Sequence, residues 1–219
     1  MARVLAIDAA SEFASLCLLE DGVEPQEVLL HSPDGFAHVL FGQLHTLLER
    51  AGMSLADMDC FAAASGPGSF TGVRVALSAA KGLADACGRP MVAVSNLAAI
   101  AWHGSAELRA VVVDARRGEI YGAVYDSGGG LVQPEVVRPL RAWLDGLPRG
   151  RTIELVSTDF TPFEAALTGR PTTTVPRALA GAVASIALER FRAGLAVDPA
   201  AVDGNYVRRS DAELNWTEA

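Results

Sequence analysis

The sequence has few cysteines and no long apolar run, and each shortage excludes a class of protein. Cys17, Cys60 and Cys87 are too few and too widely spaced for a disulfide framework or a zinc clamp, so we expect small apolar side chains in the core. No stretch of about 20 apolar residues is present. Asp8 interrupts the N-terminal apolar segment too early for a signal peptide. We therefore expect a cytoplasmic protein without a membrane span.

Positive charge is also scarce. The 219 residues include 18 Lys and Arg against 26 Asp and Glu, which gives a net charge of −8. Phosphate contacts need a positive surface, so this balance argues against a protein that binds nucleic acid on its own. Lys81 is the single lysine, so it is the one candidate for a lysine that forms a Schiff base or binds a phosphate. Hydrophobic residues make up 50% of the chain, enough to form one core or two small ones.

The first half of the chain has the pattern of an α/β unit. Apolar runs separated by turn residues predict an antiparallel meander, with Asp21-Gly22 as its first hairpin turn. Apolar residues then recur at three- and four-residue spacing, which predicts amphipathic helices. The expected strands are 3–8, 13–19, 26–31, 59–65 and 91–94, and the expected helices are 36–50, 71–87 and 95–103.

The second half repeats this pattern in outline, which suggests a duplicated α/β unit joined near residues 104–108. A strand again ends in an aspartate, Asp114, and a turn and a second strand follow. We expect an N-terminal lobe of residues 1–106 and a smaller lobe of residues 107–219, whose last helix and tail pack back on the first lobe. The expected strands are 109–114, 119–125, 131–138 and 153–158, and the expected helix is 178–193.

A glycine-rich loop follows the expected strand 59–65. Residues 65–74 read SGPGSFTGVR, and three glycines around a proline free the backbone for tight turns before a helix start with unpaired N–H groups. Such a loop can bind an anion or a partner, and an ordinary strand-to-helix turn is the alternative. No lysine follows Gly72, so it is not a Walker phosphate loop. Phe70 is bulky on this small loop and must either anchor in the core or touch a partner.

The first strand of each half ends in one aspartate. We expect both aspartates in a cleft between the lobes. Asp8 and Asp114 could each order a metal-bound water or a ribose there, although an Asp after a strand also commonly caps a turn. The histidines offer no metal site, because His31, His38 and His45 lie seven residues apart, which is about 10.5 Å along a helix.

The expected helix 71–87 has small residues around much of its circumference. Gly72, Ala76, Ala79, Ala80 and Ala84 would let another backbone approach closely. That approach could occur within the core of this chain or at a helix–helix contact with another subunit.

Four segments together resemble the TsaB (YeaZ) family of bacterial proteins. They occur in the order RVLAID at 3–8, the glycine-rich loop, DARRGEIY at 114–121 and NYVRR at 205–209. The likeness covers essentially the whole chain, and the loop is its most specific part. The loop residues that carry it are Gly66, Pro67, Gly68, Ser69, Phe70, Thr71, Gly72 and Arg74, with Val73 between the last two.

The resemblance implies a shortened two-lobed actin-like, sugar-kinase-like (ASKHA) ATPase fold of mixed sheets flanked by helices. It implies a non-catalytic subunit that pairs with the metal-bearing transferase TsaD, joined by the ATPase TsaE, to make threonylcarbamoyladenosine on tRNA. ATP, ADP and the metal would then belong to the partners, and this chain would supply no catalytic residue, metal ligand or cofactor site. It would meet tRNA only through the complex and would form a homodimer when TsaD is absent.

The pairing surface of that family uses the first two long helices, which correspond here to residues 36–50 and 70–87. The interface residues expected from this correspondence are His38, Phe41, His45, Val73, Ala76, Leu77, Ala80 and Leu83.

Two other functions stay open on the residues alone. One is a stand-alone small-molecule kinase or protease-like enzyme of the same fold, and the other is a tRNA-binding module. A kinase needs an adenosine pocket in its second lobe, for which the glycines at 128–130 are the one candidate, and a strand pattern follows them. The net charge argues against the tRNA-binding module.

Overall fold

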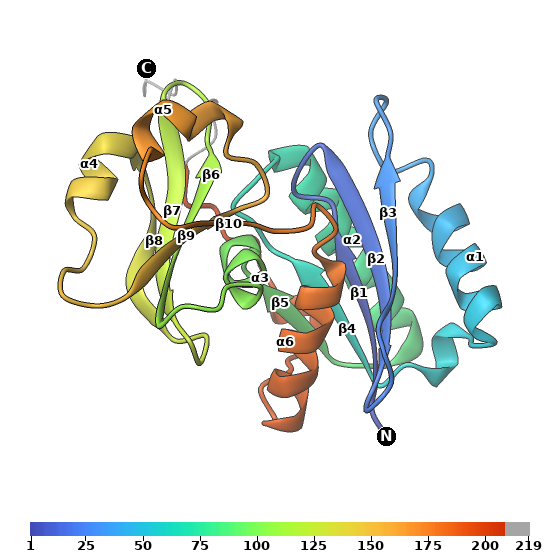
Figure 1. Ribbon diagram of the computed structural model, residues 1–219. Helices are drawn as coiled ribbons and strands as arrows, with labels where there is room; N and C mark the ends of the chain where they lie inside the picture. The colour runs from blue at the N-terminus through green and yellow to red at the C-terminus, as the bar shows by residue number, and fades with distance from the viewer. Residues whose placement is uncertain (209–219) are drawn as a thin grey trace, which may run out of the picture.

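Apolar strands separated by turn residues pair into two five-stranded sheets in the computed structural model, which describes residues 1–208 (Figure 1). Both sheets have the same strand order when each is read from its hairpin edge. The first is β3-β2-β1-β4-β5, with β1 (Arg3–Asp8), β2 (Phe13–Glu20), β3 (Gln26–His31), β4 (Cys60–Ala64) and β5 (Met91–Val94). The second is β8-β7-β6-β9-β10, with β6 (Leu108–Asp114), β7 (Glu119–Asp126), β8 (Leu131–Pro139), β9 (Ile153–Ser157) and β10 (Thr172–Thr174).

The strand pairings confirm the duplicated α/β unit. β1 runs antiparallel to β2 and parallel to β4, and β6 has the same relation to β7 and β9. The predicted meander of the first three strands is also confirmed. The strand β10 was not predicted, because its three residues are too short to show a period.

The predicted long helices are confirmed with shifted ends. The first begins at Leu40 rather than residue 36, because residues 36–39 form a turn in which Phe36 C=O accepts from the N–H groups of Val39 and Leu40. The short α4 and α5 escaped prediction. None of the helices within residues 1–208 has both the length and the apolar character that crossing a membrane requires. The helices are α1 (Leu40–Ala51), α2 (Phe70–Cys87), α3 (Asn96–Trp102), α4 (Leu140–Asp145), α5 (Glu164–Leu167) and α6 (Ala180–Arg192), with short 3₁₀ turns η1 (Leu55–Asp57), η2 (Thr161–Phe163) and η3 (Pro199–Ala201).

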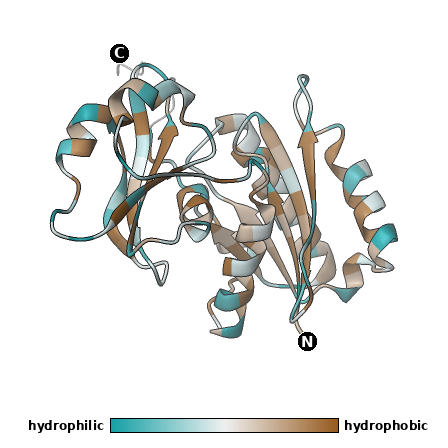
Figure 2. Cartoon of the chain, in the orientation of Figure 1, coloured by the Kyte–Doolittle hydropathy of each residue, from teal (hydrophilic) through white to brown (hydrophobic). Residues whose placement is uncertain are grey.

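Helices cover both faces of the first sheet, so the central residues of β1 and all of β4 are apolar and buried (Figure 2). Leu5 and Ile7 of β1 belong to the core that includes α1 and α2. Val4 and Ala6 belong to a second core, which includes α3, α6 and one face of the second sheet. Cys17 and Cys60 lie in this second core as small buried side chains. This shared core joins the two lobes.

The first sheet also caps the helix α6, which packs on β1, β2 and β4 although it comes late in the chain. The Oγ atom of Ser15 in β2 accepts hydrogen bonds from the N–H groups of Leu179 (3.1 Å) and Ala180 (2.9 Å). Glu27 in β3 accepts from the N–H of Gly181 at 2.7 Å. The first amides of a helix lack acceptors within their own helix, and Leu179 at the start of α6 has no side chain that could cap them. Ser15 and Glu27 therefore supply the hydrogen-bond acceptors.

Candidate functional site: an interlobe cleft and an exposed helix patch

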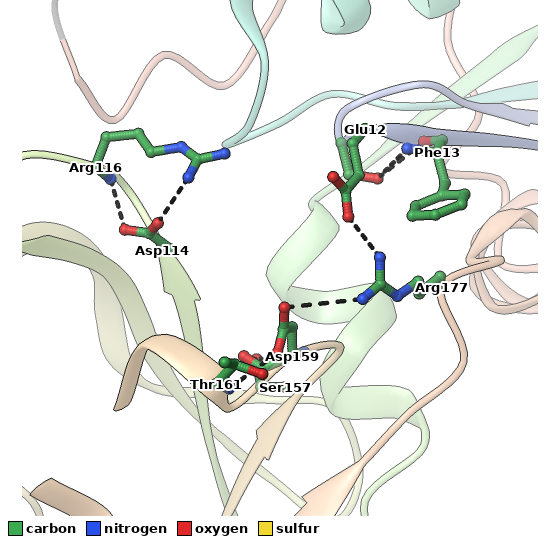
Figure 3. A network of polar contacts seen from close by, with 9 residues as sticks. Glu12, Phe13, Asp114, Arg116, Ser157, Asp159, Thr161 and Arg177 are labelled. Atoms are coloured by element: carbon green, nitrogen blue, oxygen red, sulfur yellow. Dashed lines mark hydrogen bonds and ion pairs between the residues drawn. The ribbon is translucent and has the colours of Figure 1, made fainter. Parts of the chain in front are cut away.

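A cleft lies between the β1–β2 turn of the first lobe and the β6–β7 turn and the loop after β9 of the second (Figure 3). Arg177 pairs with two residues that line the cleft, Glu12 of the first lobe at 2.5 Å and Asp159 of the second at 3.8 Å. Asp114 lines the cleft and accepts hydrogen bonds from the backbone N–H of Arg116 (2.8 Å) and from the Arg116 guanidinium (3.2 Å). A bound phosphate would therefore face three carboxylates and two arginines that are already paired.

Asp8 does not reach the surface of this cleft, so the position predicted for its side chain is wrong. It is 1% exposed, and its Oδ1 accepts from the N–H of Ala10 (3.0 Å) and from Nδ2 of Asn96 (3.0 Å). Its Oδ2 has no hydrogen-bond partner among residues 1–208. Burial raises the pKa of this carboxyl group, against the lowering effect of its two hydrogen bonds. The alternative interpretation of Asp8 as the cap of a turn is confirmed by its bond to Ala10.

The glycine-rich loop lies against the segment that follows Asp8. Gly66 N–H donates to Oδ1 of Asn96 (2.9 Å), and Ser69 N–H donates to the carbonyl of Ala10 (2.7 Å). A Cβ atom at Gly68 would lie 2.3 Å from that carbonyl oxygen, so only glycine allows this approach. Asn96 therefore connects Asp8 to the loop, and nothing in the sequence near either residue indicated this role.

The loop also starts α2. Oγ of Ser69 accepts from the N–H of Gly72 at 3.2 Å, which caps the helix. A Cβ atom at Gly72 would lie 1.8 Å from the carbonyl oxygen of Ala9. The start of α2 is thus held tightly against the end of β1, and Phe70 and Thr71 are left exposed on the outside.

An exposed apolar groove lies between α1 and α2. Phe41 of α1 is 54% exposed and Phe70 of α2 is 42% exposed. The guanidinium of Arg74 lies over the Phe70 ring, 3.7 Å from its centroid. We call this surface the α1–α2 patch, and it is lined by Ala37, Leu40, Phe41, Phe70, Thr71, Arg74, Val75, Ser78 and Ala79.

Of the eight predicted interface residues, Phe41 alone lines this surface, and four of the others are buried. Val73, Ala76, Leu77 and Ala80 are at most 6% exposed and belong to the core beneath the first sheet, so no partner can touch them in this fold. The small residues of α2 serve close packing against β1 and β4 rather than contact with another subunit. The other predicted residues are accessible to different degrees: His38, Phe41 and His45 are exposed, and Leu83 is partly buried.

The remaining predictions concern metal ligands. Within the described residues, no three His, Cys, Asp or Glu side chains gather closely enough to hold an ion. His45 instead faces Glu49 at 3.2 Å along α1.

The family model described as "TsaD: tRNA N6-adenosine threonylcarbamoyltransferase" matches residues 22–190. The chain is 35% identical to the "tRNA threonylcarbamoyladenosine biosynthesis protein TsaB" of Escherichia coli over 158 residues, which are 66% of this chain and 68% of that protein. It is 32% identical to the protein of the same name from Bacillus subtilis over 149 residues, 66% of this chain and 65% of that one. The matched stretches thus span about two-thirds of these relatives.

Solved structures resemble the whole chain. The structure titled "YeaZ from Pseudomonas aeruginosa" aligns with a TM-score of 0.80 and 29% identity over 94% of this chain and 100% of that chain. The ethanolamine utilization protein EutJ from Carboxydothermus hydrogenoformans aligns with a TM-score of 0.51 and 12% identity, over 84% of this chain and 89% of that one. The second likeness concerns the fold alone.

Proposed function

This chain belongs to the TsaB (YeaZ) family and has the shortened actin-like, sugar-kinase-like fold, and from this premise we propose that it acts in the biosynthesis of threonylcarbamoyladenosine on tRNA. Its role there is that of a non-catalytic subunit. It binds a TsaD-type transferase through the α1–α2 patch, and a TsaE-type ATPase joins the pair. In the absence of the transferase, the same patch pairs two copies of this chain.

The observation that carries this proposal is the exposure of the α1–α2 patch. Phe41 and Phe70 are large apolar side chains that project from adjacent helices, and each exposes more than two-fifths of its surface. Aromatic side chains in such a position are typical of the centre of a protein–protein interface. The patch lies on the two helices that the resemblance implies for pairing, which supports the transferase as its occupant.

The net charge and the ion pairs of the cleft support a complex in which the partner subunits, and not this chain, bind nucleotide and metal. A net charge of −8 does not favour direct binding of tRNA, so we propose that tRNA is held by the complex. The arginines of the cleft are ion-paired with Asp114, Glu12 and Asp159, which disfavours a bound polyphosphate. ATP, ADP and the metal then belong to the partner subunits.

The test is a binding measurement between the purified chain and the TsaD-type protein of the same organism. Phe41→Ser should weaken the complex by about 2 kcal/mol, which is about 30-fold, if Phe41 is a central contact. Leu131→Ser is the matched control, because Leu131 is also 54% exposed but lies on β8 of the other lobe. Equal affinity of both variants and the wild type would place the interface elsewhere.

A stand-alone kinase or protease-like enzyme is the alternative. It predicts steady hydrolysis of ATP or of a peptide by the isolated chain, lost in Asp114→Ala. Such turnover would contradict the proposal of a non-catalytic subunit.

A further inference from the structure

Residues 202–208 cross from one lobe to the other after the last 3₁₀ turn. Val202 is buried in the core of the first lobe, and the N–H of Asn205 donates to the carbonyl of Ser65 at 2.7 Å. The Arg208 guanidinium then donates to the carbonyl of Ala115 in the second lobe at 2.6 Å and also pairs with Glu119. We call residues 202–208 the strap.

A half-buried carboxylate binds the middle of the strap. Glu135 of β8 accepts hydrogen bonds from Nδ2 of Asn205, Oγ of Ser95 and Oη of Tyr125. These donors come from the strap, from the cap of α3 and from β7, so the strap has one fixed path over both lobes.

This path places Tyr206 beside the α1–α2 patch. Its ring centroid lies 5.6 Å from that of Phe70, and its Oη lies 3.5 Å from Nε of Arg74. Tyr206 is 44% exposed, and its ring packs on Gly204, where a Cβ atom would come within 2.7 Å of it. The ring is therefore held in place and yet open to a partner.

Arg74 lies over the Phe70 ring and beside the Tyr206 ring, and its side chain is exposed. Its guanidinium carbon is 3.7 Å from the Phe70 centroid and 6.0 Å from that of Tyr206. Within residues 1–208 it makes no salt bridge, and no acidic residue lines the α1–α2 patch. Stacking against aromatic rings restricts a guanidinium while its N–H groups remain able to bind a carboxylate.

We propose that the strap is the third element of the docking surface, and that Arg74, held by Phe70 and Tyr206, binds a carboxylate on the partner. This inference rests on the proposed function, because the partner is the transferase subunit. The partner surface that fits is an apolar helix face carrying an Asp or Glu opposite Arg74. The partner therefore contacts a segment whose position depends on both lobes.

The experiment compares four variants of the full chain for affinity to the TsaD-type protein. Tyr206→Leu and Arg74→Met should each weaken binding by about tenfold, while Tyr206→Phe, which keeps the ring, should bind nearly as the wild type does. Arg89→Met is the charge-matched control, because Arg89 is exposed just beyond the other end of α2. Raising NaCl from about 0.05 to about 0.5 M should weaken the wild-type complex more than the Arg74→Met complex.

The binding results distinguish a failure of the strap as a docking element from a failure of the proposed pairing with the transferase. If the wild type binds and Phe41→Ser weakens binding, but Tyr206→Leu and Arg74→Met bind normally, the strap is no part of the surface and the inference is overturned alone. If the wild type does not bind the transferase at all, the proposed function fails and the inference fails with it. Unchanged urea midpoints for Tyr206→Leu and Arg74→Met verify that lost binding is not lost folding.

Discussion

Two glycines in α2 provide a matched test of how tightly the start of this helix is held. Gly72 lies in its first turn, and Gly82 lies in its exposed middle part. The same substitution, Gly→Ala, should have opposite effects at the two positions. The difference isolates the contact between the helix start and the end of β1.

The structure supplies the magnitudes. A Cβ atom at Gly82 meets nothing within 4 Å, so Gly82→Ala should stabilise the protein by about 1 kcal/mol through helix propensity. A Cβ atom at Gly72 would lie 1.8 Å from the carbonyl oxygen and 3.0 Å from the carbonyl carbon of Ala9. These are backbone atoms of a completely buried residue and cannot rotate away, so the cost should reach about 3 kcal/mol, the upper part of the range for overpacking.

Urea denaturation followed by circular dichroism measures both effects. A cost of about 3 kcal/mol corresponds to a fall in melting temperature of roughly 6–12 °C for a domain of this size. Gly72→Ala should also weaken binding to the transferase, because Phe70 and Arg74 flank the displaced position. The reasoning is refuted if Gly72→Ala unfolds at the same urea concentration as Gly82→Ala.

Two further predictions concern buried polar groups. Ser15→Ala removes the acceptor for two amides at the start of α6 and should cost about 1–3 kcal/mol in urea denaturation, and an unchanged midpoint would contradict this cap. Burial raises the pKa of Asp8 above 3.8, so the folded state holds this proton more tightly than the unfolded state, and the contribution of Asp8 to stability falls as pH rises from about 4 through the folded-state pKa. Asp8→Asn should remove this fall in a pH series of urea midpoints, and wild-type and variant curves that stay parallel would exclude it.

Local sequence patterns predicted most of the elements because their causes are local. Residues 3–8 form a strand because their middle four residues are apolar and rich in branched side chains. Gly88, which has φ of 61°, caps the end of α2. The pattern of strand, aspartate, turn and strand in both halves correctly indicated a repeated unit, because the same order of strands and turns produces the same pairing. Family membership was also visible in the sequence, since the glycine-rich loop is specific.

Which face of α2 is exposed could not be predicted in this way. Small residues such as Ala76 and Ala80 permit close approach to any neighbour, and the first sheet occupies that side. Phe41 is different, because it lies off the stripe of buried leucines on α1 and its exposure follows from helical spacing alone.

Neighbouring residues and one contiguous motif were enough to locate most strands and helices, to indicate the repeated unit and to point to the family. The sites, in contrast, depend on contacts between segments that are far apart in the chain. Asn96 reaches Asp8 across 88 positions, and Arg74 reaches Tyr206 across 132. Such contacts produce no local pattern in the sequence, because the partner of each side chain belongs to a distant segment. Folding alone brings them together, and it turned Asp8 inward and left Tyr206 outside.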